Sequence, residues 1–202
     1  MVGLSVCLSR AQVPPSVDSP ATTAEENAIL AQVLEIECPS GTTVEVARHT
    51  CWPYMSFIVD PSDTERINKF KEHVRQSLQL ESPEIGGLIE QLFEKNPGPF
   101  RIGLSDPAGV KYAFEKDPAP DGAPPKVQEV TASDLPWILS EPATPDDGIS
   151  IGISRPAVDP ATGRVLVYVV RTAGGNVMGD VVLYDIKDGK WTQIRRGTVV
   201  MS

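Results

Sequence analysis

Residues 148–202 read GISIGISRPAVDPATGRVLVYVVRTAGGNVMGDVVLYDIKDGKWTQIRRGTVVMS. Short runs of β-branched and aromatic residues alternate here with Gly, Asp, Asn and Pro, the residues that favour turns. This alternation is typical of an antiparallel meander, in which neighbouring strands are joined by tight turns. We expect strands near residues 149–155, 164–171, 180–186 and 191–195. Because proteins of unrelated activity share such sheets, the meander predicts a fold and leaves the activity open.

The second expected strand has two apolar faces, because successive side chains of a strand point in opposite directions. One face carries Val165, Val167 and Val169, and the other carries Leu166, Tyr168 and Val170. Asp188-Gly189 follows an apolar run and predicts a tight hairpin, whose central residues need positive φ. Trp191 comes directly after this turn, so we expect its ring to pack across the sheet.

The first half of the chain has the residue spacing of helices. Thr23 is a suitable N-cap for a helix that ends near Glu37, with two glutamates in its first turn. A second helix should begin near Ser62-Asp63 and a third near Ser82, because apolar residues then recur three and four positions apart. Short strands are expected at Thr42–Arg48, Val110–Phe114 and Lys126–Val130. Helices that precede strands predict an α+β fold, with N-terminal helices packed on a C-terminal antiparallel β-meander sheet.

Length and composition fit one globular domain, which we place at residues 24–202. Of the 202 residues, 41% are hydrophobic and 22% are charged, which is ordinary for a folded domain. The net charge of −9 argues against a nucleic-acid partner, because a phosphate-binding surface needs a basic stripe. No run of about 18 apolar residues occurs, so we expect no transmembrane segment.

Residues 1–23 differ from the rest of the chain. Met1–Leu8 is apolar and uncharged, and Ser9-Arg10-Ala11 has the small residues that precede a signal-peptidase site. Residues 12–23 are rich in Pro, Ser and Thr and offer little to a core. We therefore expect an export-signal remnant and a flexible neck, and a periplasmic or secreted location; the alternative is an apolar N-terminus without a targeting role. Cys7 ends a weak lipoprotein box, since Val6 is a poor residue before a lipidated cysteine.

Four short motifs follow one another in the C-terminal part. They are Gly152-Ile153-Ser154-Arg155-Pro156, Val165-Leu166-Val167-Tyr168-Val169, Gly174-Gly175 and Gly189-Lys190-Trp191. In this order they resemble a family of uncharacterised bacterial secreted proteins and lipoproteins. The resemblance covers residues 148–202 by motif and residues 24–147 by element order. The family's glycine-rich turn often carries cysteines and residues 172–177 have none, so no site is carried over. The resemblance implies export and an α+β fold, and it implies no activity.

Cys38 and Cys51 flank the first expected strand. In an exported protein they would form a disulfide, whose loop of about 14 residues stabilises a fold by roughly 3 kcal/mol. The alternative is two partly buried thiols in a reducing compartment. His49 and Cys51 could also make contact as a nucleophile pair, but the sequence marks no orienting group or oxyanion hole. Cys38, His49 and Cys51 make three metal ligands where structural zinc needs four, so we predict no metal site. His73, alone on a helix, is expected to be solvated.

Arg155 is the remaining candidate contact, at the end of an expected strand. It could touch a ligand, but an ion pair with a buried carboxylate is the favoured interpretation. Gly174-Gly175-Asn176 is interpreted as a turn, because the lysine and helix of a phosphate loop are missing. The sequence therefore predicts no catalytic or cofactor-binding residue and no cofactor.

These observations favour a non-enzymatic extracytoplasmic module that binds a partner protein or an envelope component. A hydrolase-like enzyme with a loop-borne site is the alternative. A deep pocket with convergent titratable groups would favour the enzyme, and a shallow polar sheet face would favour the module.

Overall fold

The computed structural model describes residues 20–38, 44–51, 64–80, 83–98, 100–104, 112–114, 149–173, 176–187 and 190–201. The elements are α1 (Ala24–Glu37), β1 (Val44–Val46), α2 (Thr64–Leu78), α3 (Pro83–Lys95), β2 (Tyr112–Phe114), β3 (Ile149–Ile153), β4 (Ala157–Val158), β5 (Val165–Ala173), β6 (Asn176–Lys187) and β7 (Lys190–Met201). The expected α+β fold is confirmed. The strand predicted at Lys126–Val130 lies outside the described residues.

The strands form one mixed sheet in the order β2-β1-β3-β5-β6-β7, with β4 alongside β5. β5, β6 and β7 are the predicted antiparallel meander. Lys187 pairs with Lys190 across the second hairpin, whose turn residues Asp188-Gly189 lie outside the described part. The sheet is wider than predicted, because β1 pairs in parallel with both β2 and β3. A parallel partner can lie far away in the sequence, so no turn signal announces it.

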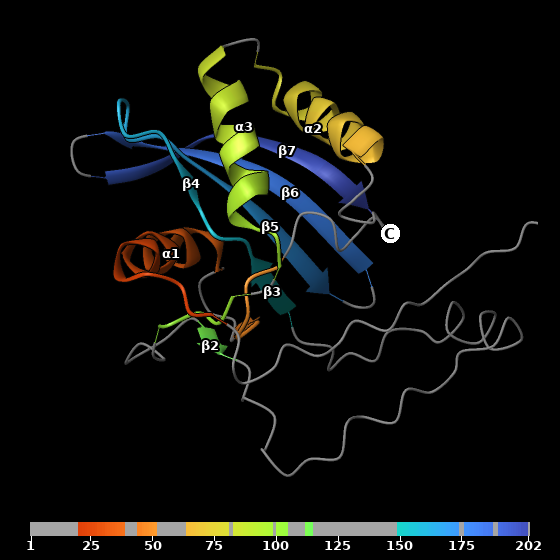
Figure 1. Cartoon of the computed structure of the whole chain (residues 1–202). Helices are drawn as coiled ribbons and strands as arrows, with labels where there is room; N and C mark the ends of the chain where they lie inside the picture. Colours follow the sequence, from red (N-terminus) through yellow and green to blue (C-terminus); the bar gives the residue numbers. More distant parts are fainter. Residues whose placement is uncertain are drawn as a thin grey trace, which may run out of the picture.

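Helices cover both faces of this sheet (Figure 1), with α1 on one side and α2 and α3 on the other. The predicted faces of β5 are confirmed. Its three odd-numbered valines pack in the cluster that contains α1, and Leu166, Tyr168 and Val170 pack in the cluster that contains α2 and α3. In the described part of the chain, no helix is long and apolar enough to cross a membrane.

Local sequence explains the start and the orientation of the helices. α1 begins with a capping box, in which Thr23 Oγ1 accepts from the Glu26 amide at 3.2 Å and Glu26 Oε2 accepts from the Thr23 amide at 3.1 Å. On α2 the buried residues are Phe70, Val74 and Leu78, spaced by one helical turn as predicted.

Two glycines allow close contacts on the α2–α3 side of the sheet. The Tyr168 ring lies over Gly179, where an added Cβ would stand 3.0 Å from the ring carbon Cζ. α2 lies against Gly197 of β7, where a Cβ would stand 2.7 Å from the backbone carbon of Ser77. A Cβ at Gly197 would overlap the backbone of α2, and a Cβ at Gly179 would crowd the Tyr168 ring and its hydroxyl, so both positions favour glycine.

The folded part begins upstream of the predicted boundary at residue 24. Ala21 forms a parallel bridge with Arg101, and the Arg101 amide donates to the carbonyl of Pro20 at 2.9 Å. Thr22 is buried, and its hydroxyl accepts from the Gly103 amide at 3.0 Å. Residues 20–23, assigned to the neck from their composition, therefore belong to the domain.

Candidate functional site

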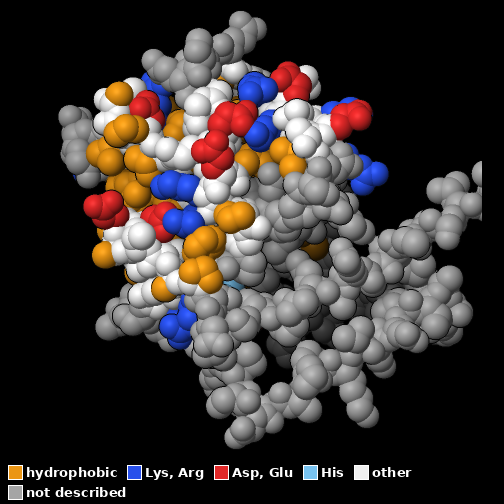
Figure 2. Space-filling view, in the orientation of Figure 1, with side chains coloured by type: hydrophobic (Ala, Val, Ile, Leu, Met, Phe, Trp, Pro, Cys, Tyr) orange, Lys and Arg blue, Asp and Glu red, His pale blue; other side chains and the backbone are white. Residues whose placement is uncertain are grey.

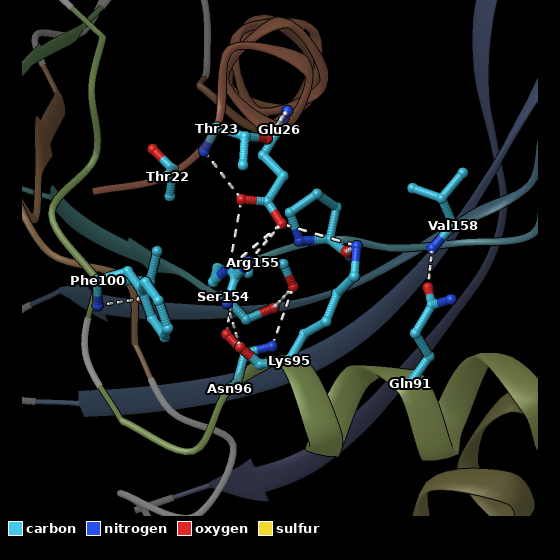
Figure 3. Close-up of polar contacts among 12 residues, drawn as sticks. Thr22, Thr23, Glu26, Gln91, Lys95, Asn96, Phe100, Ser154, Arg155 and Val158 are labelled. Carbon is cyan, nitrogen blue, oxygen red and sulfur yellow. Dashed lines mark hydrogen bonds and ion pairs between the residues drawn. The ribbon is translucent and has the colours of Figure 1, made fainter. Parts of the chain in front are cut away.

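Arg155 leaves the sheet directly after β3 and lies between α1 and the end of α3 (Figure 3). Its Nε is 3.2 Å from both carboxylate oxygens of Glu26, and its Nη2 donates to Glu26 Oε1 at 2.9 Å. Its Nη1 donates to the carbonyl of Lys95 at 2.8 Å. One guanidinium thus joins helices that pack on opposite faces of the sheet.

Asn96 and Phe100 complete this cluster. The Asn96 side chain is buried, accepts from the Arg155 amide at 2.8 Å and donates to the Arg155 carbonyl at 3.1 Å. Its side-chain nitrogen also donates to the carbonyl of Leu92 at 2.7 Å. This bond satisfies a carbonyl in the last turn of α3 that lacks a partner within the helix. The Phe100 ring lies 4.0 Å from the guanidinium carbon of Arg155, a cation–π contact.

The charges of the Arg155 cluster satisfy one another. Burial raises the pKa of Glu26, but hydrogen bonds from Arg155 and from the Thr23 amide outweigh it, so this pKa lies below its ordinary value. The Arg155 side chain is 17% exposed and the Glu26 side chain 7%. The favoured interpretation of Arg155, an ion pair with a buried carboxylate, is therefore the one observed.

The predicted Cys38–Cys51 disulfide is not formed. Cys38 belongs to the α1-side core, whereas Cys51 packs against the α2–α3 core, so the sheet separates the two thiols. The surrounding protein desolvates Cys51 and raises the pKa of its thiol to about 12. This thiol donates a long hydrogen bond to the carbonyl of Tyr168 and stays protonated near neutral pH, which argues against a Cys–His nucleophile. His73 is exposed on α2, as expected.

A second, unpredicted polar cluster lies on the α1 side of β6 and β7. We call this surface the β6–β7 face. It comprises Met178, Asp180, Ile186, Trp191, Gln193, Arg196 and Thr198. The register pairs Asp180 with Thr198, Val182 with Arg196 and Ile186 with Trp191. α1 crosses this side and ends at Glu37, which contacts the middle of the β6–β7 face.

Two carboxylates and two guanidinium groups alternate in the middle of the β6–β7 face. Arg171 and Arg196 each bond to both Glu37 and Asp180. The contacts to Asp180 Oδ2 are 2.7 and 2.8 Å long, and Arg196 Nη2 is 2.7 and 2.8 Å from the two oxygens of Glu37. Thr198 donates to Asp180 Oδ1 at 2.8 Å, and the Tyr184 hydroxyl donates to Glu37.

This network is buried on the carboxylate side and open on the guanidinium side. The Glu37 and Asp180 side chains are 1% exposed, and those of Arg171 and Arg196 are 24% and 27% exposed. Burial raises the pKa of Tyr184, and burial together with neighbouring Arg196 lowers the pKa of Arg171. Two buried negative charges meet two positive ones, so the network needs no further ion.

The ends of the β6–β7 face are apolar. Ile186 and Met178 are 44% and 41% exposed, and Ile36 at the end of α1 is 40% exposed. Trp191 is half-buried, with its ring centroid 6.2 Å from that of Tyr184, so its predicted packing across the sheet is confirmed. Figure 2 shows hydrophobic side chains gathered at the left of the view, around the β4–β5 connection, the hairpin end of β6 and β7, and α1.

A shallow groove between α3 and the β4–β5 connection is the other candidate among the described residues. Asp159 lines this groove, and its carboxylate accepts from the Ala161 amide at 2.9 Å and from the Thr162 hydroxyl at 2.5 Å. These bonds, chiefly the one from Thr162, lower the pKa of Asp159. The carboxylate thus stabilises its own turn. No three His, Cys, Asp or Glu side chains of the described ranges are grouped to hold a metal ion.

No protein family, curated protein or solved structure matched this chain. The resemblance to secreted bacterial proteins therefore rests on the sequence motifs alone.

Proposed function

We propose that this chain is a non-enzymatic extracytoplasmic module that binds a protein or envelope partner through the β6–β7 face. Exposed apolar side chains carry the proposal. Among the described residues, the large hydrophobic side chains that are exposed are Ile36, Met178 and Ile186. Two of them belong to the β6–β7 face, and the third lies on the helix that borders it. A face that combines aromatic, arginine and exposed apolar groups has the composition of a protein-binding surface.

The described titratable groups support a binding role more than a hydrolytic one. Glu26 and Glu37 are buried and fully engaged by arginine, and the Cys51 thiol is protonated near neutral pH. A catalytic base or nucleophile needs a lone pair that faces a substrate. A partly exposed polar sheet face, such as the middle of the β6–β7 face, favours a module over an enzyme.

Capture of partners from the envelope fraction of the source cells tests the proposal. The bait is the full chain, compared with a variant that carries Met178→Ser and Ile186→Ser. Because both side chains are exposed, the variant should fold normally but lose most of the captured material. The control is Lys69→Ser on α2, whose side chain is 73% exposed on the other side of the sheet. Equal capture by all three baits would contradict a role for the β6–β7 face.

Turnover of hydrolytic substrates tests the alternative. The purified chain should release no product above a buffer control from general ester, peptide or glycoside substrates. A reaction that is saturable and that survives repeated purification would favour the enzyme.

A further inference from the structure

β7 is a twelve-residue strand at the edge of the sheet. Among the described strands it pairs with β6 alone, and no other described residue makes a backbone hydrogen bond to its outer edge. An open edge of this kind is a template onto which an extended chain can add as a further strand.

The edge strand is positively charged, although the chain as a whole has a net charge of −9. β7 contains Lys190, Arg195 and Arg196 and no acidic residue. Arg196 is held by Glu37 and Asp180, but no carboxylate of the described residues pairs with Lys190 or Arg195, which are exposed. The guanidinium of Arg195 donates to the neighbouring carbonyl of Ile194, at 3.0 Å.

A second copy of the chain is a poor occupant of this edge. The midpoint of β7 falls between Arg195 and Arg196. A two-fold antiparallel pairing of two β7 strands about either residue places that arginine opposite its own copy, because directly opposed residues lie on the same face of a sheet. Like charges directly opposite in a sheet are destabilising.

Two irregularities also restrict indiscriminate pairing. The register between β6 and β7 shifts at two points, which leaves Ile194 and Val199 of β7 without a partner on β6. Both side chains pack toward the α2–α3 core. Bulges and basic residues are means by which edge strands resist non-specific addition, so a partner needs complementary charge to pair here.

We propose that β7 binds an extended acidic protein segment by strand addition, with Asp or Glu of the partner opposite Arg195 and Lys190. This inference rests on the proposed function and names the chemistry of the partner. Backbone hydrogen bonds to the open edge supply affinity, and the carboxylates supply selectivity for the partner.

Peptide binding to the full chain tests the inference. The probe is a peptide of about ten residues that alternates Glu with Thr, and the comparison peptide alternates Lys with Thr. Binding is followed by amide chemical shifts. Shifts along β7, weakening with added salt, are expected for the acidic peptide and none for the basic one. Arg195→Glu should weaken binding roughly tenfold, because it replaces an attraction by a repulsion. Lys69→Glu on α2 makes the same charge change away from the edge and should leave affinity within about twofold.

An N-methylated acidic peptide separates strand addition from simple charge attraction. It keeps the carboxylates but cannot donate backbone hydrogen bonds, so its binding should be lost. Equal binding of the methylated peptide, an unchanged affinity of Arg195→Glu, or dimerisation of the chain through β7 would overturn the inference. If the envelope capture depends on Met178 and Ile186 while β7 fails these tests, the proposed function stands and strand addition is wrong.

Discussion

The two faces of the sheet are closed in different ways. On one face, α2 and α3 together cover β5 and its neighbours with apolar side chains, including Leu166, Leu183 and Val199. On the other face, α1 is the described helix that covers the valines of β5, with Ile102 in the same cluster. Toward β7 the cover changes to the Glu37–Asp180 ion network and then to exposed side chains. In the described part of the chain, charged side chains thus lie on this face where the opposite face has a second helix. The guanidinium groups of the polar face therefore remain partly exposed, whereas the apolar face is buried under α2 and α3.

Leu166→Ala should have the largest effect on the covered face. Leu166 is fully buried between the sheet and the two helices, so its truncation leaves a cavity. We expect the free energy of unfolding to fall by about 3–4 kcal/mol, measured by urea denaturation. A loss below about 1 kcal/mol would mean that this face is loosely packed.

Glu37→Gln should have the next largest effect, on the side that α1 closes. The substitution keeps the size of the side chain but leaves Arg171 and Arg196 with one carboxylate between them. The unfolding free energy should fall by about 2–4 kcal/mol, because a half-broken buried ion network retains an uncompensated charge. Tyr184→Phe, which removes one donor to Glu37, is the milder comparison and should cost about 1 kcal/mol. A neutral result for Glu37→Gln would show that solvent screens the network.

Glu26→Gln tests the ion pair that joins the helices of the two faces, and its effect should depend on pH. The pKa of Glu26 is lowered in the folded protein. Its carboxylate therefore stabilises the fold above the ordinary pKa of about 4.5 and loses this effect as the pH falls through the lowered value. At pH 7 the variant should lose about 1.5–3 kcal/mol. The unfolding free energies of variant and wild type should converge in acid; a constant difference down to pH 2 would contradict the assignment.

Trp191→Ala should have the smallest effect, at the open end of the β6–β7 face. A fully buried ring would cost about 3–5 kcal/mol on truncation. Trp191 is half-buried and contacts Tyr184 on one side, so we expect a loss of about 1–2 kcal/mol in urea denaturation. A larger loss of unfolding free energy would mean that side chains at the hairpin end of the sheet are as tightly packed as those at its centre.

Local signals in the sequence predicted the elements well. The cap of α1, the apolar spacing of α2 and the alternation in β5 each depend on neighbouring residues, and all three are observed. The parallel pairing of β1 and the placement of helices on both faces depend on contacts between distant segments. No short-range pattern encodes them.

The two buried glutamates of α1 have a signal in the sequence. On α1, Leu30, Val33 and Leu34 form the apolar stripe, and Glu26 and Glu37 continue it at helical spacing in both directions. A buried carboxylate requires a cation nearby; Arg155, just after β3, pairs with Glu26, and Arg171 and Arg196 of the sheet pair with Glu37. The position of each glutamate was thus readable, but its partner was not, because 129 to 159 residues separate the bonded pairs.

The parallel pairing of β1 has a consequence for the order of folding. Connections of only two residues separate β5 from β6 and β6 from β7, so this part of the sheet closes small loops. β1 finds its partners β2 and β3 more than 60 and more than 100 residues away, and the chain must close long loops before these contacts form. We therefore expect the meander to be present in the folding transition state and β1 to join after it. Val46→Ala should then speed unfolding and leave the folding rate nearly unchanged in stopped-flow measurements, whereas Val182→Ala should slow folding.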